Sequence, residues 1–124
     1  MNWESEQKHE AKSMGGVSYV LRRVSYGRRA ELVRMARELT GRVEFLEAAP
    51  EKKGPLEKLE ANLLGNELEQ LYVRWGLVRI EGLKIDGEAA TVEGLIERGP
   101  EGLVREIAAR VRHELGLTEE ERKN

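Results

Sequence analysis

The sequence predicts an α+β domain, mainly α, with an N-terminal strand, an antiparallel helix hairpin, a short extended insert and C-terminal helices. Three observations predict this class: a β-branched and aromatic run at 17–24 (VSYVLRRV), two long segments with a helical apolar period, and short alternating pieces over 77–90. The length of 124 residues suits one domain with its own core. We expect a single globular domain over 17–117, preceded by a flexible N-terminal arm over 1–16 and followed by a charged C-terminal tail over 118–124.

The N-terminal arm is polar and has no sustained period, which is typical of a mobile end. Trp3 is its one large aromatic side chain. This residue is either solvated within a loose arm or an anchor onto a partner or a neighbouring subunit. Gly15 and Gly16 then separate the arm from the predicted strand.

The first predicted helix covers residues 28–47. Its apolar residues recur at alternating steps of four and three, namely Leu32, Ala36, Leu39, Val43 and Leu46. Gly41 interrupts the pattern, but the spacing continues beyond it, so one helix is preferred over a break at Thr40 and Gly41. Two prolines and a glycine predict a loop over 48–55.

The second predicted helix begins near Pro55, which suits a first helical turn, and ends at Gly76 as a C-cap. Two helices of similar length joined by a short loop predict an antiparallel hairpin. The apolar stripe of the second helix contains Leu56, Leu59, Leu63, Leu64, Leu68, Leu71, Tyr72 and Trp75.

The rest of the chain predicts a small extended insert followed by two helices. Asp86 and Gly87 form a turn signal, which favours a small hairpin whose second arm is 88–90. Thr91 is a suitable N-cap for a helix over 92–97. Gly99 and Pro100 break the chain before a last helix, which Gly116 terminates. The apolar residues of that helix are Leu103, Val104, Ile107, Ala108, Val111 and Leu115.

The residues that usually carry enzyme chemistry are absent or scattered. There is no cysteine, which excludes disulfides and thiolate chemistry and suits a reducing compartment. His9 and His113 lie more than a hundred positions apart, and no glycine-rich phosphate loop or nucleophile motif occurs. We therefore expect a protein that is not an enzyme and has no catalytic residue, metal or cofactor. No apolar run is long enough for a membrane span, so we expect a cytoplasmic protein.

Charge is distributed unevenly although the formal net charge is only -2. Residues 17–42 contain seven arginines and two glutamates, whereas residues 44–70 contain seven glutamates and three lysines. The two helices of the hairpin either screen each other or dock a basic face on an acidic face of another subunit. Binding of RNA by arginines is a third interpretation, weakened by the acidic total. The basic candidate residues are Arg22, Arg23, Arg28 and Arg29.

The end of the second helix also suggests a binding surface. Its leucines and aromatics are either core or the lining of a groove beside the hairpin. Tyr, Trp and Arg dominate the energetics of protein interfaces, and an apolar groove of this kind accepts an amphipathic helix. The candidate partner-binding residues are Leu64, Leu68, Leu71, Tyr72 and Trp75.

Three stretches resemble small tail assembly chaperones of long-tailed bacteriophages and prophages. They are YVLRRVSYGRRAEL at 19–32, LYVRWGLVRIEGLKIDGEAAT at 71–91 and LTEEERKN at 117–124. The resemblance covers most of the chain after residue 17, through loose motifs of which none is catalytic.

The resemblance implies a non-enzymatic role in the cytoplasm of a bacterial host cell. Proteins of this family coat the helical tape measure protein and leave it as tail tube subunits polymerise. The resemblance transfers no individual functional residues, and we also expect self-association into a homo-oligomer. The alternatives are a permanent tail or connector subunit and a small RNA-binding regulator.

Overall fold

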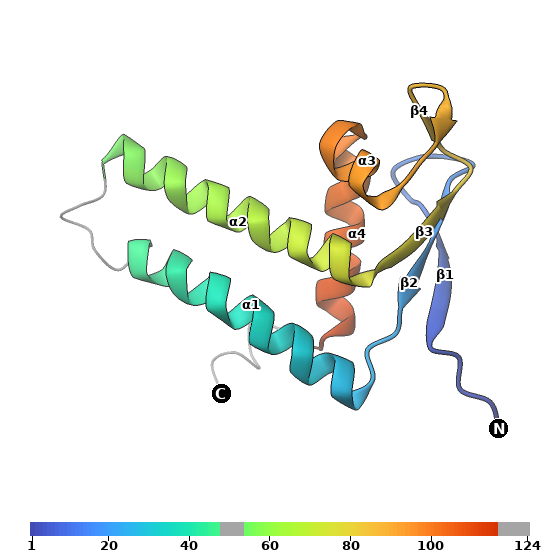
Figure 1. Ribbon diagram of the computed structural model, residues 1–124, viewed down its shortest axis with the longest axis horizontal. Helices are drawn as coiled ribbons and strands as arrows, with labels where there is room; N and C mark the ends of the chain where they lie inside the picture. Colours follow the sequence, from blue (N-terminus) through green and yellow to red (C-terminus); the bar gives the residue numbers. More distant parts are fainter. Residues whose placement is uncertain (48–53, 117–124) are drawn as a thin grey trace.

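The computed structural model describes residues 1–47 and 54–116, and it confirms a mainly helical α+β fold. The strands are β1 (Glu6–Glu10), β2 (Ser18–Arg22), β3 (Leu77–Glu81), β4 (Lys84–Ile85) and β5 (Glu88–Ala89). The helices are α1 (Tyr26–Glu47), α2 (Pro55–Gly76), α3 (Val92–Arg98) and α4 (Glu101–Glu114). The helix hairpin of α1 and α2 extends away from a base that contains the strands, α3 and α4 (Figure 1).

The base contains an antiparallel sheet with the strand order β1-β2-β3. Tyr19 and Leu21 of the central strand β2 join the hydrophobic core, while Val20 points to the other face. Between β2 and β3, Val20 pairs with Arg79 and Leu21 pairs with Leu77. This register leaves an extra residue in β3, which is a β-bulge.

The prediction of a flexible arm over 1–16 is wrong for residues 6–10, which form β1. All five residues of β1 pair with β2, from Glu6 opposite Arg22 to Glu10 opposite Ser18. The sequence EQKHE has neither β-branched nor alternating apolar residues, so no local pattern identifies it as a strand. The segment is a strand because its backbone pairs with β2, which lies further along the chain.

The hairpin prediction is confirmed, with α1 and α2 packed side by side (Figure 1). The helix α1 is continuous through Gly41, so no break occurs at that glycine. Leu32 and Ala36 are buried and Leu39 is half-buried. The side chains of Val43 and Leu46, and residues 48–53 of the loop predicted over 48–55, lie outside the described residues.

The small hairpin and the helix caps follow the sequence prediction. Asp86 and Gly87 both have positive φ, at 54° and 83°, and they connect β4 to β5. The Thr91 hydroxyl accepts a hydrogen bond of 3.0 Å from the Gly94 amide, as expected of an N-cap. Gly116 has φ 73°, the left-handed conformation expected after α4. The predicted tail over 118–124 lies outside the described residues.

Gly76 has a different role from the predicted C-cap. It is the last residue of α2 and does not have a positive φ. A Cβ at this position would lie 2.7 Å from Val111 Cγ2. Gly76 is therefore needed because α4 packs closely against the end of α2, in a core that also contains Leu103, Ile107 and Leu115.

Candidate functional site

A groove of about 810 Å³ lies between α2 and α4, and we call it the α2–α4 groove. Leu68, Tyr72 and Ala108 supply its apolar floor, where Tyr72 is only 4% exposed. Polar side chains form the walls: Asn62, Asn66 and Glu69 on α2, and Arg105 and Arg112 on α4. An apolar floor between polar walls suits the apolar face of an amphipathic helix.

A second hollow of about 240 Å³ extends this surface toward α3. It shares Asn66, Glu69 and Arg105 with the α2–α4 groove, and it adds apolar contacts from Ile96 and Val104. Along α4 the two hollows extend from position 101 to position 112. That distance is about 16 Å, which is about three helical turns.

Two exposed leucines lie on α2 beside these hollows. Leu59 is 56% exposed and Leu63 is 54% exposed, and the nearby Glu60 and Glu67 are exposed as well. We call these four residues the Leu59 edge. Leu59 and Leu63 each lie three positions before a groove-wall residue, Asn62 and Asn66 respectively, so they form an exposed apolar border to the groove and extend the candidate binding surface.

Gly65 lines the groove in the middle of α2, and none of the described residues packs so closely against it that a glycine is required. A Cβ added there would meet nothing within 4 Å. A glycine inside a helix costs roughly 1 kcal/mol relative to alanine. Gly41 in α1 and Gly102 in α4 have equally open surroundings, but of these three glycines Gly65 lines the groove, where the missing side chain lets another backbone approach closely.

The five predicted groove residues divide into two groups. Leu68 and Tyr72 line the groove, whereas Leu64 is buried and is not among its lining residues. Leu71 and Trp75 are half-buried against the core. Two of the five predicted residues therefore line the groove, and the other three pack in or against the core.

Sequence reasoning missed Leu59, Leu63, Arg105 and Arg112 as surface candidates. The signal for the two leucines was present, because positions 59 and 63 lie on a different side of a helix from positions 64, 68, 71 and 75. No comparable signal exists for the arginines. Their relation to the groove depends on how α4 crosses α2.

The four predicted basic residues do not form one free cationic site. Arg22 and Arg29 are exposed, but Arg23 and Arg28 contact the N-terminal segment. The Arg23 guanidinium lies 4.1 Å from the centre of the Trp3 ring, and Arg28 Nη1 donates to the Ser5 carbonyl at 3.1 Å. Trp3 remains 62% exposed, and this cation–π contact is made within its own chain.

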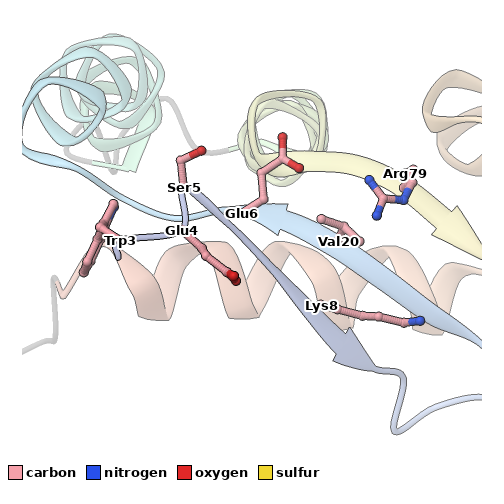
Figure 2. A pocket seen from close by; sticks show the side chains of 7 residues that line it. All are labelled: Trp3, Glu4, Ser5, Glu6, Lys8, Val20 and Arg79. Carbon is pink, nitrogen blue, oxygen red and sulfur yellow. The ribbon is translucent and has the colours of Figure 1, made fainter. Parts of the chain in front are cut away.

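The open face of the sheet carries a separate hollow of about 500 Å³ (Figure 2). Its lining includes Lys8 from β1, Val20 from β2 and Arg79 from β3. The Glu81 carboxylate neutralises both cations, with Lys8 Nζ at 3.3 Å and Arg79 Nε at 3.4 Å. These interactions lower the pKa of Glu81, and the hydrogen bond from Lys8 is the largest cause. Cations paired within the face offer little to an anionic ligand.

A cluster around Glu106 fastens the N-terminal segment to α4. Its carboxylate accepts hydrogen bonds from the Lys12 and Ser13 amides at 3.0 and 2.8 Å, and from the Tyr19 hydroxyl at 2.8 Å. Arg110 Nε donates to the same hydroxyl at 3.0 Å. Burial alone raises the pKa of Glu106, but these donors outweigh burial and hold the pKa at about 2. The carboxylate is therefore a fixed acceptor that organises the base.

Tyr19 and His9 complete this cluster. Burial raises the pKa of Tyr19, with the hydrogen bond to Glu106 acting in the same direction. The His9 ring lies 5.7 Å from the Tyr19 ring, and burial followed by the charge of Arg110 lowers the pKa of His9. His113 is exposed near the C-terminal end of α4.

Residues 1–47 and 54–116 contain neither a cluster of metal-binding side chains nor a helix suited to a membrane span. Within those ranges, no three His, Asp or Glu side chains lie close enough together to hold a metal ion. None of the helices found there has the length and apolarity needed to cross a bilayer.

No protein-family model, curated protein sequence or solved structure matches this chain.

Proposed function

We propose that this protein is a non-enzymatic tail assembly chaperone of a long-tailed bacteriophage or prophage, acting in the bacterial cytoplasm. Its client is the helical tape measure protein, which it binds before the tail tube polymerises. The observation that supports this role is the α2–α4 groove with two half-exposed leucines, Leu59 and Leu63, at its side. The sequence resemblance supports the same role.

The proposed contact places the apolar face of a client helix on Leu68, Tyr72 and Ala108. Leu59 and Leu63 then cover the exposed flank of the client, because they lie on the neighbouring side of α2. A helix binds such a groove through apolar residues at spacings of three and four. The two hollows extend along about three turns, which is enough for a short client segment.

A chaperone must also release its client when the tube assembles. A shallow groove with a small apolar floor gives moderate affinity at each site. Many copies along one long client then provide retention through multivalency. The mixed-charge surface of the chain opposes non-specific association after release.

The direct test is co-expression with a tape measure protein and capture through a tag on the present chain. We expect enrichment of the client, and we expect about tenfold less capture for the double variant Leu59→Gln/Leu63→Gln. Glutamine retains helix propensity, so the variant remains folded. The matched control is Tyr26→Gln, because Tyr26 is 95% exposed on α1 and does not line the groove. Equal capture by the double variant and the wild type contradicts the proposed site.

Mass spectrometry of mature phage particles separates this role from that of a permanent tail subunit. A chaperone is absent from the finished particle, whereas a connector or tail subunit is present in it. Detection of the chain at the stoichiometry of structural proteins contradicts the chaperone proposal.

A further inference from the structure

The Leu59 edge and the α2–α4 groove are complementary to each other. The edge presents two half-exposed leucines beside two exposed carboxylates, Glu60 and Glu67. The groove presents an apolar floor with two guanidinium groups, Arg105 and Arg112, on its α4 wall and one carboxylate, Glu69, on its α2 wall. The α4 wall of the groove therefore carries the charges that pair with the two carboxylates of the Leu59 edge.

The charges on the two surfaces also match in spacing. Glu60 and Glu67 are seven residues apart on α2, and Arg105 and Arg112 are seven residues apart on α4. Seven residues span about 10.5 Å along a helix, or close to two turns. Two helices aligned along their axes can therefore form both ion pairs at once.

These charged groups are unpaired or weakly paired within the part of the chain that the structure describes. Among the described residues, Arg112, Glu60 and Glu67 have no hydrogen-bond or ion-pair partner. Arg105 pairs with Glu101 at 3.4 Å, but both side chains are mostly exposed. A surface pair of this kind within one helix is weak and exchanges partners readily.

We propose that two copies of this chain associate by placing the Leu59 edge of one copy in the α2–α4 groove of the other. Glu60 and Glu67 of one copy face Arg105 and Arg112 of the second, and the leucines cover the floor. Gly65 lets the two backbones approach, which gives this mid-helix glycine a purpose. A client helix uses the same groove, so client binding and self-association oppose each other.

The test is sedimentation of the purified full chain over a wide range of concentrations. We expect reversible self-association of the wild type. Arg112→Glu and Glu67→Arg should each raise the dissociation constant about tenfold, because each places like charges together. The double variant Arg112→Glu/Glu67→Arg restores the pairing with exchanged partners, and we expect it to recover to within about threefold of the wild type.

His113→Glu is the matched control for Arg112→Glu. His113 is exposed at the same end of α4 but does not line the groove. Thermal unfolding followed by circular dichroism verifies that every variant is folded. A monomer at all concentrations, association that neither single variant weakens, or a double variant that does not recover would each overturn the proposal. Because the assay contains no client, these outcomes leave the chaperone proposal to its own test.

Discussion

The base and the α2–α4 surface use the same kinds of residues in opposite ways. In the base and at the end of α2 that joins it, Gly76 and Gly82 fill positions that reject a side chain, and the Glu106 carboxylate accepts several hydrogen bonds. On the α2–α4 surface, Gly65 has open space around it, and Arg112 has no partner among the described residues. The α2–α4 surface therefore combines open space with an unpaired guanidinium beside a groove, and this combination makes it the candidate binding surface.

The first test of this contrast is Gly82→Ala, for which we expect the largest effect. Gly82 has φ 84°, and an added Cβ would collide with the Gly16 carbonyl oxygen. We expect a loss of about 3 kcal/mol in the free energy of unfolding, measured by urea denaturation. Gly87→Ala is the control, because Gly87 has φ 83° and no neighbour within 4 Å. We expect that control to lose only about 1 kcal/mol.

The second test is Glu106→Gln, which removes the charged acceptor of the Lys12 and Ser13 amides. We expect a loss of about 2 kcal/mol at neutral pH, because hydrogen bonds to a carboxylate are stronger than those to an amide. Urea denaturation of both proteins measures the difference. A variant as stable as the wild type would show that this cluster contributes nothing to the base.

The same variant predicts a change in pH dependence. The pKa of Glu106 falls from its ordinary value of 4.5 to about 2 in the folded chain. Its stabilisation is therefore complete above about pH 4.5 and is lost as the pH falls toward about 2. The stability of the wild type should decline more steeply over this interval than that of Glu106→Gln. Parallel pH profiles would contradict the assignment.

The third test is a substitution that should raise the stability of the isolated chain, whereas the two preceding substitutions lower it. Gly65→Ala should stabilise the isolated chain by up to about 1 kcal/mol, because alanine favours helix and its Cβ meets no atom. It should nevertheless weaken self-association, since the methyl group separates the two backbones. Gly41→Ala, in α1, has the same open surroundings and should stabilise without weakening association. Unfolding and sedimentation measured on both variants separate these effects.

The smallest expected effect on stability belongs to Leu63→Gln. Leu63 is half-exposed and glutamine has similar helix propensity, so the free energy of unfolding should change by less than about 0.5 kcal/mol. Client capture and self-association should still decrease. A large loss of stability would show that Leu63 belongs to the core and not to a binding surface.

Much of the fold was predictable from short-range patterns. Four features each depend only on neighbouring residues: the β-branched run at β2, the apolar periods of α1 and α2, the Asp86–Gly87 turn and the Thr91 cap. The candidate site was only partly predictable. The stripe on α2 identified Leu68 and Tyr72, but it also included Leu64, which is buried away from the groove.

The order and type of the main helices and of β2 follow from the spacing of residue types, because backbone preferences and amphipathic periods act over a few neighbours. Three features depend on tertiary structure: the pairing of β1 with β2, the need for a glycine at position 76, and the guanidinium groups that line the groove. Each of them requires segments far apart in the chain, such as β1 with β2 or α2 with α4, to lie against each other. Local sequence patterns do not contain that information, since the contact energy arises only when both segments are in place.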